Sequence, residues 1–238
     1  MSVVALIDHA VLQPTQTAAD LRAACALCAE LEVASLCVKP SMVPQAVAWM
    51  SETTIPVGTV IGFPHGGTST AAKIRETEVA CGAGAREVDM VINLGHALAA
   101  AWPEVEEDIR AVVEVATKAG ALTKVIFETG LLPGDEAKIR LCQISQRAGA
   151  AFVKTSTGFG FVKRSDGSMA STGATEHDIR LMRAHCGDQV QVKASGGIRT
   201  YEDAKRFAAL GATRLGTSST TAIAAGQRGE SAGSSGEY

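Results

Sequence analysis

The sequence predicts an α/β fold, a single (β/α)8 TIM barrel over residues 1–225, followed by a flexible Gly/Ser-rich tail over residues 226–238. Three observations predict this fold. The chain has 238 residues, a length usual for one barrel of this kind. Its composition is globular, with 46% hydrophobic, 20% charged and 4% aromatic residues. Eight short apolar runs also alternate with longer segments of helical period, as repeated β/α units require.

The expected strands are apolar runs bounded by turn residues. Their starts lie roughly 20 to 40 residues apart, enough for a strand, a helix and two loops in each crossover. An open doubly wound sheet needs similar elements but usually has fewer strands. The runs are 5–8, 34–39, 57–62, 87–93, 122–128, 151–155, 190–195 and 213–216.

The expected helices place apolar residues three or four positions apart, with charged residues on the opposite face. Several are followed by a glycine, which takes the left-handed conformation that ends a helix. They span 17–31, 44–50, 69–81, 102–119, 135–148, 175–185 and 201–210, with a short helix at 221–225 before the tail.

Composition argues against several classes of partner. The formal charge is -3, there is no basic stripe and aromatic residues are few, so we expect no nucleic acid. No apolar run approaches the ~18 to 20 residues that a membrane helix needs, so we expect no membrane. The six cysteines lie within apolar patterns, as reduced core thiols do, which favours a cytoplasmic protein.

No motif indicates a metal or a nucleotide. The five histidines are dispersed, without the spacing of a metal site, and the chain has neither a Gly-x-Gly-x-x-Gly turn nor a P-loop. We therefore expect no cofactor.

Lysine is the unusual residue of the expected strands. Four of the nine lysines fall in or at the ends of strand runs, namely Lys39, Lys124, Lys154 and Lys193. Removing an ammonium from water costs several kcal/mol, so a single strand lysine usually pairs with an acid. An amine crowded by a second cation in a dry pocket instead loses its proton and can form a Schiff base with a carbonyl compound. If Lys154 and Lys193 face the barrel axis from adjacent strands, they are close neighbours.

Two acids and two turns complete the candidate site. Asp89 is a charge in the middle of a strand and needs a cation or a substrate hydroxyl. Asp8 is similar but lies at a strand end, where capping or pairing with a strand lysine explains it at least as well as catalysis does. Glycine-rich turns at 195–199 and 216–219 follow the last two strands, where this fold commonly binds phosphate. Tight strand-to-helix connections are the alternative explanation of these turns.

Taken together, the motifs resemble the deoxyribose-phosphate aldolase family of class I aldolases. The matching blocks span the chain in the family's order: IDHAVLQP, SLCVKP, VIGFPHG, EVDMVINLG, KVIFETGLL, FVKTSTGFG, KASGGIRT and RLGTSS. The resemblance implies reversible cleavage of 2-deoxy-D-ribose 5-phosphate to acetaldehyde and D-glyceraldehyde 3-phosphate. It also implies that the enzyme needs no cofactor and forms a homodimer.

The resemblance also assigns roles to individual residues. Lys154 is the amine that forms the Schiff base, Lys193 the cation that lowers its pKa, and Asp89 a group that transfers protons through water. Lys124 joins the same polar network, and the terminal Tyr238 assists proton exchange. The residues matched to the phosphate site are Gly158, Gly196, Gly197, Ser218 and Ser219.

The chain departs from the family at Ala10 and Gln13, where Thr and Lys are more common, and segment 161–172 is longer than in many relatives. Two other functions stay open on the residues alone. Another Schiff-base sugar-phosphate aldolase, or a transaldolase-like enzyme, shares the lysine and the phosphate site. A noncatalytic sugar-phosphate-binding barrel would bind the same kind of ligand and leave it unchanged.

Overall fold

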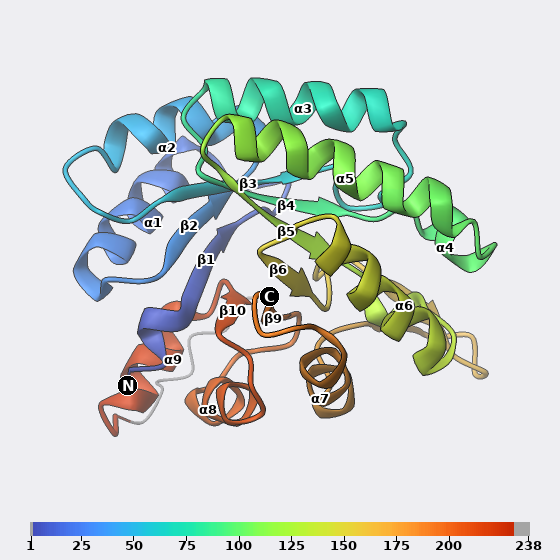
Figure 1. Ribbon diagram of the computed structural model, residues 1–238. Coiled ribbons are helices and arrows are strands. Elements are labelled where there is room, and N and C mark those ends of the chain that lie inside the picture. Colours follow the sequence, from blue (N-terminus) through green and yellow to red (C-terminus); the bar gives the residue numbers. More distant parts are fainter. Residues whose placement is uncertain (1, 231–238) are drawn as a thin grey trace.

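The computed structural model describes residues 2–230, in which eight parallel strands close into a barrel (Figure 1). Around the barrel the order is β1, β2, β3, β4, β5, β6, β9 and β10, and β10 pairs with β1 to close it. The predicted barrel is therefore confirmed. The strands are β1 (Ile7–Val11), β2 (Ser35–Val38), β3 (Val57–Ile61), β4 (Glu87–Val91), β5 (Leu122–Ile126), β6 (Phe152–Lys154), β9 (Gln191–Ser195) and β10 (Arg214–Thr217).

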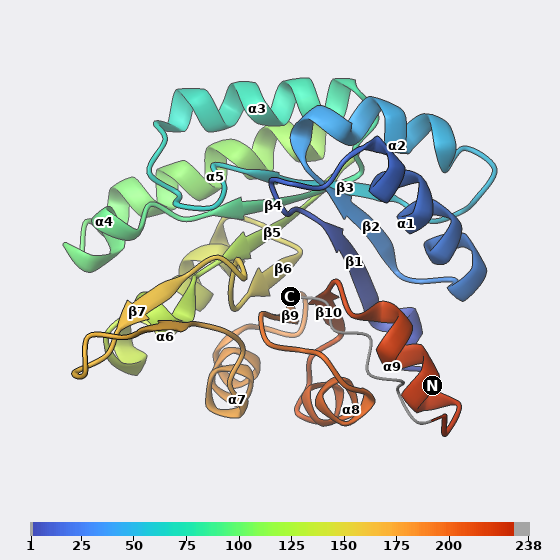
Figure 2. The same cartoon turned by 180° about the vertical axis from the view of Figure 1, so that it is seen from behind.

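Helices surround the barrel, as Figures 1 and 2 show from opposite sides. They are α1 (Ala18–Leu31), α2 (Val43–Trp49), α3 (Thr70–Gly82), α4 (Leu94–Leu98), α5 (Trp102–Lys118), α6 (Gly134–Arg147), α7 (Glu176–His185), α8 (Tyr201–Ala209) and α9 (Thr220–Gln227). Capping boxes begin α1 and α8, where Thr17 and Thr200 bond reciprocally with the acid three positions later. Among residues 2–230, no helix combines the length and apolarity needed to cross a membrane.

Several boundaries differ from those expected. The run at 5–8 begins as the 3-10 helix η1 (Val4–Leu6), and its strand starts at Ile7. The segment at 161–172 forms an antiparallel hairpin, β7 (Phe161–Lys163) with β8 (Met169–Ser171), at the barrel rim (Figure 2). Helix α9 extends through Gln227 into the expected tail, because the Oε1 atom of Gln227 accepts a hydrogen bond from the Val3 amide at 2.9 Å.

Buried ion pairs tie neighbouring helices together. The Lys73 Nζ on α3 contacts Asp108 Oδ2 on α5 at 2.5 Å and also donates to the Val91 carbonyl at 2.8 Å. Lys138 on α6 pairs with Asp178 on α7 at 2.6 Å. Because Val91 is the last residue of β4, the first pair also fixes the carboxyl end of the strand that carries Asp89.

Candidate active site

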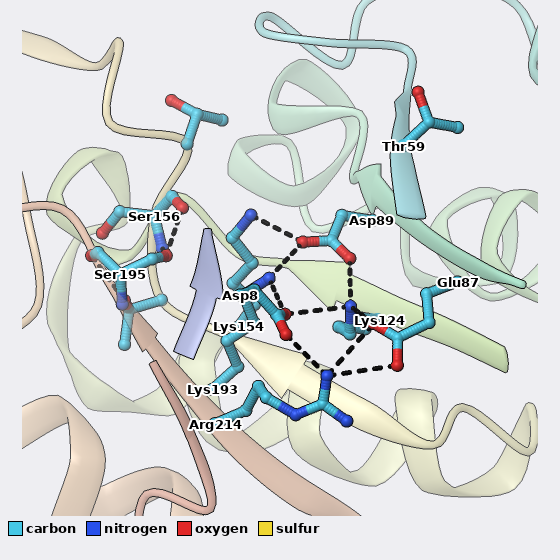
Figure 3. Close-up of polar contacts among 12 residues, drawn as sticks. Asp8, Thr59, Glu87, Asp89, Lys124, Lys154, Ser156, Lys193, Ser195 and Arg214 are labelled. Carbon is cyan, nitrogen blue, oxygen red and sulfur yellow. Dashed lines mark hydrogen bonds and ion pairs between the residues drawn. The ribbon is translucent and has the colours of Figure 1, made fainter. Parts of the chain in front are cut away.

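Four of the residues singled out from the sequence converge inside the barrel (Figure 3). Lys154 on β6 lies in register with Lys193 on β9, and Asp89 on β4 lies in register with Lys124 on β5. Strand alternation turns all four side chains toward the axis. None of them is more than 3% exposed. Lys154 and Lys193 are therefore neighbours, as expected.

Asp89 is the centre of this cluster. Its Oδ2 atom accepts hydrogen bonds from Lys154 at 2.8 Å and from Lys193 at 2.7 Å. Its Oδ1 atom accepts a hydrogen bond from Lys124 at 2.9 Å. One carboxylate therefore contacts three ammonium groups, which fixes the position of each amine.

Asp8 supplies a second negative charge, and it shares Lys193 with Asp89. It accepts hydrogen bonds from Lys193 and, at 2.5 Å, from Arg214, and it lies 3.1 Å from the Lys124 Nζ. The pairing of Asp8 with strand lysines, one of the expected alternatives, is thus observed.

Sequence reasoning missed two members of the network, Glu87 and Arg214. Glu87 contacts Lys124 at 2.5 Å and Arg214 at 3.1 Å. A signal was available, because Glu87 precedes Asp89 by two residues and therefore shares its inward face. Arg214 lies in register with Lys193, but that register is visible only in the folded barrel.

The network gives its three lysines different proton affinities. Burial lowers the pKa of Lys154, and the nearby Lys193 lowers it further, against the opposing effect of Asp89. Burial also opposes the charged form of Lys193, but Asp8 and Asp89 outweigh it and raise the pKa. Burial likewise opposes the charge of Lys124, and its three carboxylate neighbours hold the pKa well above its usual value.

The Asp89 and Asp8 carboxylates stay ionised. Burial alone would raise the pKa of Asp89, but Lys124, Lys154 and Lys193 hold it well below its usual value. The pKa of Asp8 is lowered for the same kind of reason. The network has three carboxylates, on Asp8, Glu87 and Asp89, and four basic groups, on Lys124, Lys154, Lys193 and Arg214. By formal charge the network therefore carries one excess positive charge, which loss of the Lys154 proton removes.

The candidate phosphate residues gather on one side of the barrel mouth. Gly158 follows β6, Gly196 and Gly197 follow β9, and Ser218 and Ser219 follow β10, three strands that are successive around the barrel. The three glycines have positive φ angles of 83°, 84° and 79°. Ser219 is the residue that precedes α9, at its N-cap position. Helix N termini and open backbone amides favour anions, so this side of the mouth suits a phosphate group.

Another buried acid near the barrel mouth, Glu128, was not singled out from the sequence. It follows β5 with a φ of 43° and is 1% exposed. Its carboxylate accepts hydrogen bonds from the Thr157 amide and the Thr172 hydroxyl, each at 3.1 Å. It thereby ties the loop after Lys154 to the end of the β7–β8 hairpin. The sequence around Glu128 does not indicate this role, because only the packing of the hairpin brings Thr172 to the Glu128 carboxylate.

The hairpin also reaches the phosphate side through Gly173. A Cβ atom on Gly173 would lie 2.6 Å from the Gly196 carbonyl oxygen, so only glycine permits this approach. The departure at 161–172 is therefore a structural element that packs on the candidate site.

Of the other candidate residues, Lys39 lies outside the charged network and Tyr238 lies outside the part of the chain that the structure describes. The Lys39 Nζ donates to the carbonyls of Gln13, Pro14 and Gln16 at 2.7 to 3.3 Å, so it serves the loop after β1. That interaction uses only the backbone of Gln13.

An open cavity of about 720 Å³ adjoins the loops after β1, β2 and β3. Its lining includes Lys39, Phe63 and Phe159, and the two phenylalanine rings meet edge to face at 5.4 Å. This volume suits a small organic ligand. Within residues 2–230, no three His, Cys, Asp or Glu side chains are grouped so as to hold a metal ion.

Known proteins resemble the chain over nearly its whole length. Residues 2–232 match the family described as DeoC/LacD family aldolase. A deoxyribose-phosphate aldolase of Carboxydothermus hydrogenoformans is 47% identical over 223 residues, covering 93% of each chain. The structure of a putative deoxyribose-phosphate aldolase from Coccidioides immitis has a TM-score of 0.88 and 38% identity, covering 95% of this chain and 85% of that one.

A third similar structure is a deoxyribose phosphate aldolase from Aeropyrum pernix, described as a unique tetramer. It has a TM-score of 0.83 and 28% identity, and the match covers 93% of this chain and 88% of that one. The family match, the two similar barrels and the relative with nearly half its residues identical agree. The chain belongs to the DeoC/LacD family of aldolases.

Proposed function

We propose that this protein is a class I aldolase that reversibly cleaves 2-deoxy-D-ribose 5-phosphate to acetaldehyde and D-glyceraldehyde 3-phosphate, with Lys154 as the Schiff-base lysine. One observation carries the assignment of the lysine. The Lys154 amine is buried beside Lys193, its pKa is lowered, and it lies 2.8 Å from the Asp89 carboxylate. A nucleophilic amine needs this environment. The names of the similar enzymes support the substrate.

The reaction begins with the neutral Lys154 amine. It attacks C1 of the open-chain sugar to form a carbinolamine, which takes up a proton and loses water to give an iminium ion. A base removes the proton of the C3 hydroxyl, the C2–C3 bond breaks, and its electrons move to the iminium nitrogen. Glyceraldehyde 3-phosphate departs and an enamine remains on Lys154. The iminium is the electron sink, so these steps need no metal or organic cofactor.

The second half of the reaction regenerates the free Lys154 amine. The enamine takes a proton at C2, and water hydrolyses the new iminium to acetaldehyde and the free amine. We assign proton transfer to Asp89 acting through water, which typically contributes ~10² to 10⁴ in rate. Lys193 keeps Lys154 partly neutral, and Lys124 holds the second oxygen of Asp89 in place.

The phosphate group is assigned to the mouth beyond β6, β9 and β10. Backbone amides at Gly158, Gly196 and Gly197 would face its oxygens, and Ser218 and Ser219 would add the N terminus of α9. This side of the mouth adjoins Lys154 on β6, as a substrate with its aldehyde at one end and its phosphate at the other requires.

Borohydride reduction tests the proposal directly. Incubating the protein with 2-deoxyribose 5-phosphate and sodium borohydride should add the reduced substrate or its two-carbon fragment to Lys154, as located by peptide mass mapping. Lys154→Met should abolish both the adduct and turnover. A main adduct on Lys193 or another lysine, or none, would contradict the assignment. Dihydroxyacetone as the better donor would indicate a ketose-type aldolase instead.

We also propose that the enzyme acts as a homodimer in the cytoplasm. All six cysteines are buried free thiols, a state that a reducing compartment maintains. The family resemblance supports the dimer, whereas the similar Aeropyrum pernix enzyme is described as a tetramer. Sedimentation equilibrium at assay concentrations distinguishes the two assemblies.

A further inference from the structure

The hydroxyl of Thr217 joins the two loops that flank the phosphate region. Thr217 is the last residue of β10 and is 7% exposed. Its Oγ1 atom donates to the Ile198 carbonyl at 2.7 Å and accepts a hydrogen bond from the Ser219 amide at 2.9 Å. Ile198 follows Gly196 and Gly197, whereas Ser219 lies at the N-cap position of α9. One side chain therefore fixes the distance between the glycine loop and the start of the helix.

His9 braces the same helix from the neighbouring strand. It lies in register with Thr217, and its Nδ1 atom is 2.8 Å from the Oγ1 of Thr220, the first residue of α9. Both side chains of this hydrogen bond are buried. Burial lowers the pKa of His9 to about 4, so the imidazole is neutral near pH 7.

Neither Thr217 nor His9 points into the barrel. Their neighbours Gly216 and Asp8 are in register with each other, and Asp8 belongs to the charged network on the axis. Alternation turns Thr217 and His9 to the opposite face, toward the helices. Any effect of these two residues on the ligand must therefore act through the loops that they hold.

We propose that Thr217 and His9 are positioning residues that hold the phosphate-binding loops, and that they thereby set the preference of the enzyme for a phosphorylated over an unphosphorylated sugar. This inference rests on the phosphate assignment made under the proposed function. Backbone amides bind phosphate only when they converge on the same oxygens. Loss of the Thr217 hydroxyl frees the Ser219 amide and the Ile198 carbonyl at once, so the loops can separate.

The test compares 2-deoxyribose 5-phosphate with 2-deoxyribose. Thr217→Val keeps the shape of the side chain and removes both hydrogen bonds. It should raise KM for the phosphorylated sugar about tenfold, the effect of a typical hydrogen bond, and change kcat much less. The ratio of kcat/KM between the two sugars should fall by about the same factor.

Two control variants separate positioning from general damage. Thr217→Ser retains the hydroxyl and should restore most of the preference. Thr213→Val makes the same change just before the first residue of β10, where the hydroxyl donates to the side chain of the exposed Gln191 at 2.9 Å. It should leave the preference at the wild-type value.

His9 provides a second variant if Thr217→Val does not fold. His9→Leu removes the bond to Thr220 and should lower the preference in the same direction, whereas His9→Asn keeps a polar group near Nδ1 and should lower it less. Equal loss on both sugars would overturn the inference, because it would show a merely structural role.

The outcomes also separate this inference from the proposed function. If the wild-type protein cleaves both sugars equally well, the phosphate assignment itself fails. If the wild type prefers the phosphorylated sugar and both Thr217→Val and His9→Leu keep that preference, only the positioning role is overturned.

Discussion

Lys154 and Lys193 lie directly opposite each other on β6 and β9, and both donate to the same Asp89 oxygen, at 2.8 and 2.7 Å. They differ in their other acidic partners. Within residues 2–230, Lys154 pairs with Asp89 alone, Lys193 with Asp8 and Asp89, and Lys124 with these two and Glu87. Each additional carboxylate favours the ammonium form, so Lys154 gives up its proton most readily. The distribution of acids therefore selects the nucleophile.

Lys193→Met should raise the pKa of Lys154. The substitution removes the cation that lowers this pKa and leaves Asp89 to stabilise the Lys154 ammonium. Because a smaller fraction of the amine is then neutral at pH 7, imine formation should slow by about tenfold for each unit of the pKa change. The rise of kcat/KM with pH should accordingly move to higher pH.

The measurement is the pH dependence of kcat/KM together with the rate of borohydride trapping. Lys205→Met, which removes an exposed lysine on α8, is the matched control and should leave both profiles in place. A profile of Lys193→Met that coincides with the wild type would remove the assigned role of Lys193.

Gly173→Ala should weaken binding of the phosphorylated substrate. The added methyl group would lie 2.6 Å from the Gly196 oxygen and 2.9 Å from its carbonyl carbon, so the loop after β9 must move. KM for 2-deoxyribose 5-phosphate should rise by about tenfold or more, as expected when a well-placed hydrogen bond to a charged group is lost. KM for 2-deoxyribose should change less.

Gly82→Ala is the control for that substitution, because a Cβ atom at Gly82 meets nothing within 4 Å. Its kinetics should match those of the wild type. Unchanged KM in Gly173→Ala would show that the loop after β9 moves without cost to the substrate.

Whether a feature of the site could be predicted from the sequence depends on how far apart in the chain the interacting residues lie. Asp89, Lys154 and Lys193 were predictable because a charge within an apolar run, at an inward position of a strand, is visible locally. The partnership of Arg214 with Asp8 joins strands more than two hundred residues apart, through the closure of β1 on β10. Nothing local encodes that register.

The same reason explains the hairpin. From the sequence, segment 161–172 differs from the family only in its length. Its two strands are exposed on alternate residues and have no core pattern of their own. The contacts that give the hairpin its place, from Thr172 to Glu128 and from Gly173 to Gly196, lie just beyond its second strand and depend on packing against β5 and β9.

Glu128→Gln should loosen the hairpin. The Glu128 carboxylate accepts hydrogen bonds from the Thr157 amide, the Thr157 hydroxyl and the Thr172 hydroxyl. The neutral amide keeps the shape of the side chain but loses the negative charge that strengthens these hydrogen bonds. The free energy of unfolding should fall by about 1 to 2 kcal/mol, because a hydrogen bond to a charged acceptor contributes about 1 kcal/mol more than one to a neutral acceptor.

Urea unfolding measures this loss, and limited trypsin digestion reports on the hairpin, whose tip carries Lys163 and Arg164. Cleavage there should be faster in Glu128→Gln than in the wild type. Glu114→Gln, an exposed substitution on α5, should alter neither property. Equal digestion rates would argue that the hairpin is held by other contacts.

His9 should make the folded state less stable in mild acid. Its pKa is about 4 in the folded protein, lowered by burial from 6.5, so between these values the unfolded chain binds more protons than the folded one. Stability therefore rises with pH in this window and is lost as the pH falls from about 6.5 toward 4. Between pH 7 and pH 4.5 this single group should contribute a loss of about 2 kcal/mol. Urea unfolding of the wild type and of His9→Asn at these two pH values isolates the contribution of His9. All other groups that titrate between these pH values are common to both proteins, so their effects cancel in the comparison. The variant should lose about 2 kcal/mol less than the wild type, and parallel losses would mean that His9 is already solvated or protonated in the folded barrel.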